Sequence, residues 1–404
     1  MSEILFLAHR LPFPPDRGDK IRSHHVLKAL TKLAPVHVAS FVDVAADWAH
    51  LGALAAVAES HCVAARSKPL ALAGIEAVLR GEPVSLAAFG SARLARYVER
   101  VLATRPISAI YVFSGQMGQY VPADFPGRVI VDLVDVDSAK FEAYAAGASW
   151  PRSWVDAREA RTLAVEEARL AARADATLLV SEAEAELLRS RLPGPAKVLA
   201  LGNGIDTAAF DPAGVAPAEL GEGPQLVFTG QMDYAPNIAA ALRAIDRVLP
   251  GVRRHHPQAQ FHVVGRAPTR ELLARDGRDG VRIHGEVPDV KPFLAAADIV
   301  LVPLEIARGV QNKVLEAMAM ARPVVLTPGA ATGIGATDGV ELAVEESDAG
   351  LAARTLALLA DPRAAQTMGE AARHFVIAER GWGAMLAGLP AILGFDGKVR
   401  RDAA

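Results

Sequence analysis

A buried strand, a glycine-containing loop, a charged helix start and a second buried strand follow one another between residues 298 and 327. The two strand-like runs, Asp298–Pro303 and Val324–Thr327, are short and almost continuously apolar. Such runs are typical of parallel strands that are buried on both faces of a sheet. Strands of this kind are joined by helices, so the segment predicts an α/β fold with a parallel sheet.

The loop and helix between these strands have the composition of a phosphate site. A helix that begins just after a parallel strand directs free N–H groups and a partial positive charge at the ligand crevice. Gly309 would allow close approach of the backbone, Lys313 would add a full charge, and Glu316 would accept hydrogen bonds from ribose hydroxyls. Lys313 and Glu316 also fit an ordinary solvated helical pair, but their spacing after the loop favours a pocket. The expected donor contacts in this segment also include Val310, Gln311 and Asn312.

The whole chain alternates short apolar strands with alanine-rich helices, and its 404 residues exceed the size of one growing core. We therefore predict two domains, each with a parallel sheet. The predicted divisions are a first domain over 1–205, a linker over 206–224, a second domain over 225–380, and a C-terminal helix over 381–404 that crosses back to the first domain. The predicted strands are Ile4–Ala8, Val36–Phe41, Ala109–Phe113, Val129–Leu133, Ala176–Val180 and Val198–Leu201, then Gln225–Thr229, Phe261–Val264, Val281–His284, Asp298–Pro303 and Val324–Thr327.

Charge and cysteine usage exclude several classes of protein. A formal net charge of −3 and a pI near 6.4 argue against nucleic-acid binding, which needs a concentrated basic surface. Cys62 is the only cysteine, so neither a disulfide nor a cysteine-based metal site is expected. The sequence shows no secretory leader and no apolar run of membrane-spanning length, which predicts a cytoplasmic protein. Arginines between Arg152 and Arg173, or the basic tail Lys398–Arg401, would suit peripheral contact with the inner membrane.

The first predicted strand is followed by a proline-rich loop that ends in Gly18, Asp19 and Lys20. This loop leads into a helix predicted over 21–33, where a ligand would meet the helix N-terminus. We expect the three residues to contact donor phosphates or an anionic acceptor. The loop also fits an ordinary capping turn with Asp19 as the N-cap, and the two interpretations are compatible.

Three carboxylates, Asp132, Asp135 and Asp137, cluster at the end of another predicted buried strand. Burying carboxylates is unfavourable unless they bind a ligand or cap a helix, so we expect a functional role. Clustered carboxylates also suit Mg²⁺. Which of Asp135 and Asp137 faces an acceptor stays open from sequence.

Further turns of the second half also follow predicted strands. Their glycines would let the backbone approach a ligand, and Arg266 would contact a diphosphate. Asn237 is a natural N-cap for the next helix. The candidate residues of these turns are Gly230, Gly265, Arg266, Gly285 and Val287.

Several of these segments together resemble glycosyltransferase family 4, also called group 1. The motif residues are Pro303, Gly309, Leu315–Ala319 and Arg322–Val325, with Ala321 where the family usually has glycine. Asn203–Asp206, with Phe210 and Pro212, is similar to the interdomain signature of that family. Pro14–Ser23 and Ala307–Glu316 are most similar to sugar transferases of the exosortase/PEP-CTERM systems.

The resemblance implies the GT-B architecture, in which two Rossmann-like parallel-sheet domains face each other across a cleft. It implies retaining transfer of a hexose from a UDP or GDP sugar to a hydroxyl of a glycan or polyprenyl-linked acceptor. It also implies a role in exopolysaccharide synthesis and no required metal or permanent cofactor. Lys313 and Arg266 would face the diphosphate and Asp135 or Asp137 the acceptor. Arg308 stands where many members have a donor-contacting glutamate, so the role of that glutamate does not carry over, and Arg308 is instead a candidate to contact a sugar hydroxyl, a carboxylated sugar or the diphosphate. A nucleotide-sugar epimerase and a non-catalytic sugar-binding protein are the alternatives.

Overall fold

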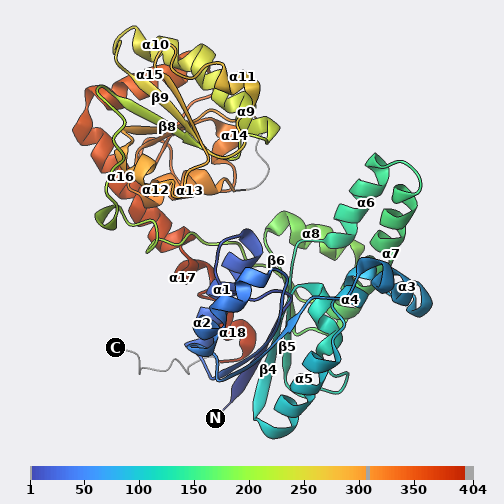
Figure 1. The fold of residues 1–404 in the computed structure, drawn as a ribbon. Helices are drawn as coiled ribbons and strands as arrows, with labels where there is room; N and C mark the ends of the chain where they lie inside the picture. Colours follow the sequence, from blue (N-terminus) through green and yellow to red (C-terminus); the bar gives the residue numbers. More distant parts are fainter. Residues whose placement is uncertain (1, 306–309, 396–404) are drawn as a thin grey trace. The chain divides into compact units, whose positions relative to one another are not determined.

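The computed structural model describes residues 2–305 and 310–395, and the chain divides into two compact units (Figure 1). Unit 1 contains residues 1–203 and 385–404, and unit 2 contains residues 204–384. The chain therefore leaves unit 1 once, completes unit 2, and returns.

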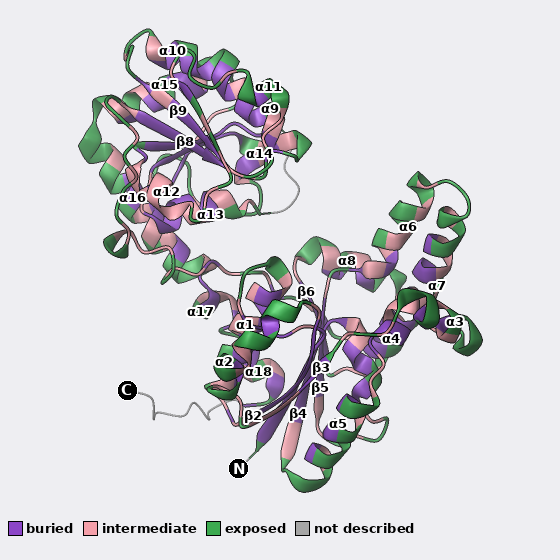
Figure 2. Ribbon diagram, viewed as in Figure 1, coloured by how far each residue is buried: buried purple, intermediate pink, exposed green. Residues whose placement is uncertain are grey.

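Unit 1 is built on a seven-stranded sheet in the order β3-β2-β1-β4-β5-β6-β7, in which every neighbouring pair is parallel. β1 and β2 are buried along their whole length (Figure 2), because most of their side chains are apolar on both faces. The strands are β1 (Glu3–Ala8), β2 (Val36–Val42), β3 (Ser60–Ala65), β4 (Ile107–Phe113), β5 (Arg128–Val134), β6 (Ala176–Leu179) and β7 (Val198–Ala200).

Helices connect these strands, and one of them comes from the far end of the sequence. Leu389 and Leu393 of α18 are buried, and α18 packs on β5. The helices of unit 1 are α1 (Gly18–Thr31), α2 (Leu51–Ala55), α3 (Leu70–Arg80), α4 (Val84–Ala88), α5 (Ala92–Thr104), α6 (Asp137–Gly147), α7 (Arg152–Arg173), α8 (Glu182–Arg191) and α18 (Leu389–Leu393).

A buried ionic cluster ties the centre of unit 1 together. The Arg22 guanidinium, 1% exposed, donates to both carboxylate oxygens of Asp132 at 2.9 and 3.1 Å. It also donates to the Leu201 carbonyl at 2.7 Å and to the Asn203 side-chain oxygen at 3.0 Å. The Tyr111 hydroxyl donates to Asp132 at 2.7 Å. The cluster joins α1, β4, β5 and the segment that leaves unit 1.

Unit 2 contains a six-stranded parallel sheet in the order β10-β9-β8-β11-β12-β13. The strand order reverses between β8 and β11, the position beside which open α/β sheets bind ligands at their carboxyl edge. The strands are β8 (Gln225–Thr229), β9 (Gln260–Val264), β10 (Val281–Gly285), β11 (Ile299–Val302), β12 (Val324–Leu326) and β13 (Ala343–Val344).

Helices also cover this second sheet, and the longest of them come after β13. A π-helical turn over Ala244–Val248 joins α9 to α10. The helices are α9 (Ala235–Arg243), α10 (Leu249–Arg253), α11 (Arg270–Leu273), α12 (Lys291–Ala296), α13 (Asn312–Ala319), α14 (Pro328–Ala331), α15 (Asp348–Ala360), α16 (Pro362–Phe375) and α17 (Trp382–Met385).

The two parallel sheets predicted from the sequence are confirmed, but two edge strands were missed. β3 is half-polar and partly exposed, and β13 has two residues, so neither gives a clear apolar run. The helix predicted over 21–33 begins earlier, at Gly18, with Arg17 as its N-cap. The single helix predicted near the C-terminus is two short helices, α17 and α18.

The stretch 206–224, predicted as a linker, belongs to unit 2. The Arg373 guanidinium donates to the Phe210 carbonyl at 2.8 Å and lies 3.1 Å from Asp211. The Ala218 amide donates to the Pro292 carbonyl at 2.9 Å. These contacts hold the stretch against α16 and the start of α12. Among the described residues, no helix combines the length and apolar character needed to cross a membrane.

Candidate functional site

A hollow of about 560 Å³ opens at the carboxyl edge of the unit 2 sheet. The turns after β8, β9 and β10 and the start of α13 form its walls, which places it beside the reversal of strand order. Its lining residues are Thr229, Gly230, Gln231, Tyr234, Asn237, Val264, Gly265, Arg266, Glu286, Val287, Val290, Val310, Gln311, Asn312, Lys313 and Glu316. Nearly all the donor residues predicted from sequence in the described range therefore line one hollow.

Two glycines bring the first two turns into direct contact. Gly265 has φ +154°, and a Cβ at this position would lie 1.6 Å from the Gly230 carbonyl oxygen. The Gly230 amide donates to the Val264 carbonyl at 3.0 Å, and the Gly265 amide donates to the Gly285 carbonyl at 2.8 Å. Any side chain at Gly265 would push these turns apart, so glycine keeps the floor of the hollow closed.

The Lys313 side chain crosses the hollow to α9. Its Nζ donates a hydrogen bond to the Asn237 side-chain oxygen and lies 4.7 Å from the centre of the Phe228 ring. Burial lowers the pKa of Lys313 to about 8, while the nearby Glu316 acts in the opposite direction. The Lys313 amine is held by a neutral amide and a ring, and Glu316 offsets its desolvation only in part, so an anionic ligand would relieve the rest.

Glu316 lies one turn after Lys313 on α13. Burial raises the pKa of the Glu316 carboxyl, and Lys313 and Lys291 act to lower it. α13 begins at Asn312 with Gln311 as its N-cap, so its first amides face the hollow. The site thus combines a helix N-terminus, a buried amine and a carboxylate that can accept hydrogen bonds from hydroxyls.

Asn237 was predicted as the N-cap of the helix after β8, and this is wrong. Tyr234 is the N-cap, and Asn237 is buried in the first turn of α9. Its amide donates to the Gln231 carbonyl at 2.9 Å while its oxygen accepts from Lys313. The residue therefore positions the lysine rather than the helix end.

Thr229 and Glu286 are among the lining residues that sequence reasoning did not predict. The Thr229 hydroxyl is buried and has no hydrogen-bond partner among the described residues. It lies at the end of β8 in the wall of the hollow, where a ligand would satisfy it. Its position as the last residue before a glycine turn was the signal that sequence offered. For Glu286, the only signal in the sequence was its position directly after Gly285.

Arg308 and Gly309, predicted to contact the donor, lie outside the described residues. Val310, Gln311 and Asn312 follow them directly and line the hollow. Gly285 ends β10, and Val287 is in the wall.

In unit 1, the three predicted carboxylates have different surroundings. Asp132 is fully buried in the ion pair with Arg22, so its role is structural. Burial raises the pKa of Asp135, and Glu184 and Asp137 raise it further. Burial also raises the pKa of Asp137, whose Oδ1 lies 3.7 Å from Lys140 Nζ.

Backbone strain accompanies Asp135. Val134 has φ +72°, a conformation that is strongly disfavoured for a β-branched residue. Strain of this kind persists only where the surrounding structure enforces it, and it is common at functional sites. A small hollow of about 10 Å³ adjoins both Asp135 and Asp137, with room for one water at most.

The predicted phosphate loop of unit 1 is largely occupied by its own ion pairs. Lys20 Nζ is buried and donates to Asp47 at 2.8 Å, so its charge is already paired. Asp19 does not cap α1. It accepts from the Arg10 and Arg17 guanidiniums, and hydrogen bonds from these groups and His9 hold its pKa well below its usual range against the opposing effect of burial. Gly18 starts α1 with open space around it.

Within the described ranges, no group of three or more His, Cys, Asp or Glu side chains is arranged to hold a metal ion. Of the three aspartates near β5, Asp132 is paired with Arg22.

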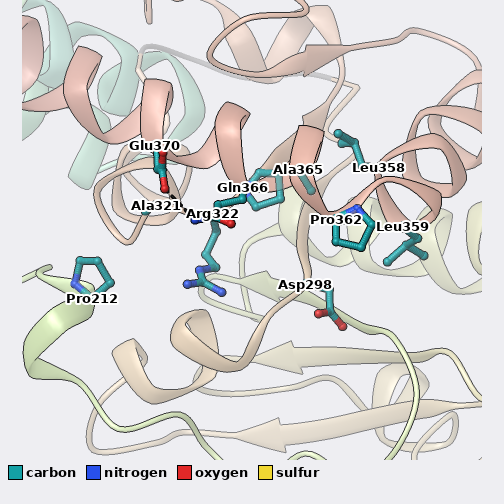
Figure 3. A pocket seen from close by; sticks show the side chains of 11 residues that line it. Pro212, Asp298, Ala321, Arg322, Leu358, Leu359, Pro362, Ala365, Gln366 and Glu370 are labelled. Carbon is teal, nitrogen blue, oxygen red and sulfur yellow. Dashed lines mark hydrogen bonds between the residues drawn. The ribbon is translucent and has the colours of Figure 1, made fainter.

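A second hollow of unit 2, about 420 Å³, lies at the opposite edge of the sheet, where β11 and β12 begin (Figure 3). Arg322 and Asp298 project into it, and the Gln366 amide donates to Glu370 at 2.8 Å on α16. Leucines and prolines form the rest of the wall. It lacks the glycine turns and the helix N-terminus of the carboxyl-edge site.

Comparison with known proteins finds a similarity that is confined to part of the chain for the family model and covers most of the chain for the solved structures. Residues 223–361 match the family model described as "Glycosyl transferases group 1". Glycogen synthase of Mycobacterium tuberculosis is 27% identical over 269 residues, which are 64% of this chain and 63% of that protein. The match thus spans less than two thirds of the relative's length.

Solved structures share the fold over nearly the whole chain. HepE of Anabaena, in complex with UDP and glucose, has a TM-score of 0.58 at 16% identity and covers 98% of this chain and 100% of its own. Sucrose-phosphate synthase of Thermosynechococcus elongatus has a TM-score of 0.59 at 16% identity, covering 97% and 98%. These similarities confirm the fold of two parallel-sheet domains that GT-B glycosyltransferases have, and residues 223–361 are similar to the group 1 glycosyltransferases.

Proposed function

We propose that the protein is a retaining glycosyltransferase that moves a hexose from a nucleotide diphosphate sugar to a hydroxyl of a glycan or polyprenyl-linked acceptor. The observation that carries the proposal is the hollow in unit 2, where Lys313 and the α13 N-terminus meet above the Gly230–Gly265 contact. The group 1 match over the same residues supports it.

The chemistry of the hollow suits a departing diphosphate. Negative charge grows on the phosphate as the glycosidic bond breaks, and preorganised donors at that position lower the barrier. Lys313, the first amides of α13 and Arg266 are the donors that this chain offers. Glu316 would hold the ribose hydroxyls, and Thr229 would satisfy its hydroxyl on the ligand. Charge stabilisation by these groups would need no metal.

UDP is the favoured nucleotide over GDP, because HepE, a structural neighbour, binds UDP and glucose in its complex. In unit 1, Asp135 and Asp137 with Gly18 would line the acceptor side. Export-polymer synthesis at the inner face of the membrane is the setting that the sequence resemblance suggests.

The test is calorimetric titration of UDP, GDP and ADP into the wild type, Glu316→Gln and Glu271→Gln. Glu271 is an exposed glutamate of α11 outside the hollow, so it is a matched control. We expect UDP to bind with a Kd between micromolar and millimolar, about −8 to −4 kcal/mol. Glu316→Gln should weaken binding about tenfold and Glu271→Gln should leave it unchanged. Absence of nucleotide binding by the wild type would refute the proposal.

A further inference from the structure

One side of unit 1 exposes large apolar side chains on α3. The inward side of this helix consists of Ala73 and Ala77, which are fully buried. The outward residues are much larger, and their exposed fractions run from 47% to 81%. They are Leu72, Ile75, Val78 and Leu79.

Helix geometry places these four residues together. With about 100° of rotation per residue, they occupy the side opposite Ala73 and Ala77. A helix normally buries its large apolar residues and exposes polar ones. α3 does the reverse, and Figure 2 shows most of it as exposed.

The start of α7 continues this apolar side. The Arg158 guanidinium donates to the carbonyls of Ala77 and Glu82 at 2.8 and 3.1 Å, which fixes α7 against the end of α3. Trp154 lies one turn before Arg158, and Val155 lies one turn before Glu159. Trp154 and Val155 are therefore on the side of α7 that carries Arg158 and Glu159. Trp154 is 57% exposed and Val155 48% exposed. We call Leu72, Ile75, Val78, Leu79, Trp154 and Val155 the α3–α7 apolar surface.

The exposed charges around this surface are mainly positive. Arg80, Arg152 and Arg161 are exposed, with Arg152 3.6 Å from Asp156, and Glu82 between the helices is half-buried. The other nearby acids are already engaged. Glu159 is buried and accepts the amides of Val84 and Ser85 at 2.7 and 2.9 Å, and Asp156 is buried beside Arg152.

We infer that the α3–α7 apolar surface contacts a bilayer that contains anionic lipids. Leucine, isoleucine and tryptophan flanked by arginine are the composition of helices that lie in the membrane interface. The outward sides of two helices form ridges, which a fluid bilayer accepts without a complementary groove. Positive charge beside the ridges complements anionic headgroups.

Membrane contact would bring the protein to a polyprenyl-linked acceptor, which is held in a membrane, so the inference rests on the proposed function. The surface itself is built from residues other than those of the nucleotide hollow. Vesicle binding and nucleotide binding can therefore fail separately.

The test is co-flotation of the full chain with vesicles of phosphatidylcholine, with or without phosphatidylglycerol. The variant Leu72→Gln/Leu79→Gln removes two exposed leucines, and Leu273→Gln/Val340→Gln removes two apolar residues of unit 2, each 50% exposed, as the matched control. We expect the wild type and the control to float with anionic vesicles. The leucine pair should lower the partition coefficient about tenfold or more.

Two charge variants and one hydrodynamic measurement complete the design. Arg80→Gln and Arg161→Gln should each weaken binding to anionic vesicles about fivefold and leave binding to neutral ones unchanged. Failure of the wild type to float, or equal flotation of the leucine pair, would overturn the inference. So would a dimer in sedimentation velocity that the leucine pair abolishes, because the surface would then join two copies of the chain. The affinity of the same variants for UDP should equal that of the wild type. If neither the wild type nor any variant bound UDP, the proposed function would be refuted and the membrane inference would not.

Discussion

The two units share the same strand order around the point of reversal, yet their carboxyl edges differ in what fills them. In unit 2, glycine turns leave a hollow of about 560 Å³ around Lys313, whose pKa is lowered by burial although Glu316 lies nearby. In unit 1, the charges near the edge are paired with each other, as Lys20 with Asp47 and Arg22 with Asp132. Paired buried charges build a framework, whereas a desolvated charge beside open space indicates a ligand.

The largest effect is expected in the framework of unit 1. Arg22→Met should lower its free energy of unfolding by about 4 kcal/mol, because Asp132 would stay buried without its counter-charge. Urea denaturation would measure the loss. Arg96→Met, an exposed arginine of α5, is the matched control and should change stability little. If Arg22→Met lost less than about 1 kcal/mol, the ion pair would not be the framework that we describe.

The next effect compares one glycine from each edge. Gly265→Ala places a Cβ 1.6 Å from the Gly230 carbonyl, so it should destabilise unit 2 by about 3 kcal/mol and abolish most UDP binding. Gly18→Ala meets no atom within 4 Å and should be neutral to within about 0.5 kcal/mol. Thermal unfolding and calorimetry would measure both. Equal effects at the two glycines would remove the contrast between the edges.

Lys313→Met should raise the stability of the protein and weaken its binding of UDP. Between pH about 8 and 10.5 the folded lysine is neutral while the unfolded one is charged, so wild-type stability rises with pH across that window. Below about pH 8 the lysine is charged in both states, so the folded wild type carries the full cost of burying a charged amine. Lys313→Met removes that cost and should be more stable than the wild type by about 2 kcal/mol at pH 7. UDP affinity should fall about tenfold.

Urea melts at pH 7 and pH 10.5, with UDP titrations at pH 7, would test the lysine. The variant should lack the rise in stability with pH. A variant less stable than the wild type at pH 7 would show that the Asn237 hydrogen bond outweighs the desolvation of the amine.

The smallest effect concerns the carboxylates of unit 1. Burial raises the pKa of Glu167 to about 6 from 4.5, although Ser138 donates to it from both its amide and its hydroxyl. Stability should therefore fall as pH rises from 4.5 to 6, because the folded state then binds more protons. Glu167→Gln should be about 1 kcal/mol more stable at pH 7 and equal to the wild type below pH 4.5.

The control for Glu167 is Glu186→Gln on the exposed side of α8, which should show no such difference. Stability measured from pH 4 to pH 7 would separate the two. A wild-type profile without the fall would contradict the burial of a charged Glu167.

The sequence predicted the sheets well and the partners of charged residues poorly. β8 and β11 are apolar because the fold buries them on both faces, and this apolar character is visible in the sequence of each strand by itself. Lys313 and Lys20 both follow a glycine-containing loop at a helix start, and nothing local distinguishes them. Only the fold brings Asp47 to Lys20 and Asn237 to Lys313, since these partners are 27 and 76 residues away.

The same limit applies to the three aspartates at and just after the end of β5. Local sequence places them in one cluster, but Arg22, 110 residues away, claims Asp132 for the core. The strained φ of Val134 is also invisible in the sequence, because valine gives no sign that it will adopt a left-handed conformation.

The return of residues 385–395 to unit 1 has a consequence for how the protein is made. On the ribosome, domains generally fold as units in the order in which they emerge. The ribosome completes unit 2 before it adds α18, so the surface of β5 that α18 covers stays uncovered until then. Leu389 and Leu393 then arrive last to bury it. Unit 1 precedes unit 2 in the chain and yet reaches its final packing after it, and a nascent chain that stops before residue 389 would leave that surface open to other partners.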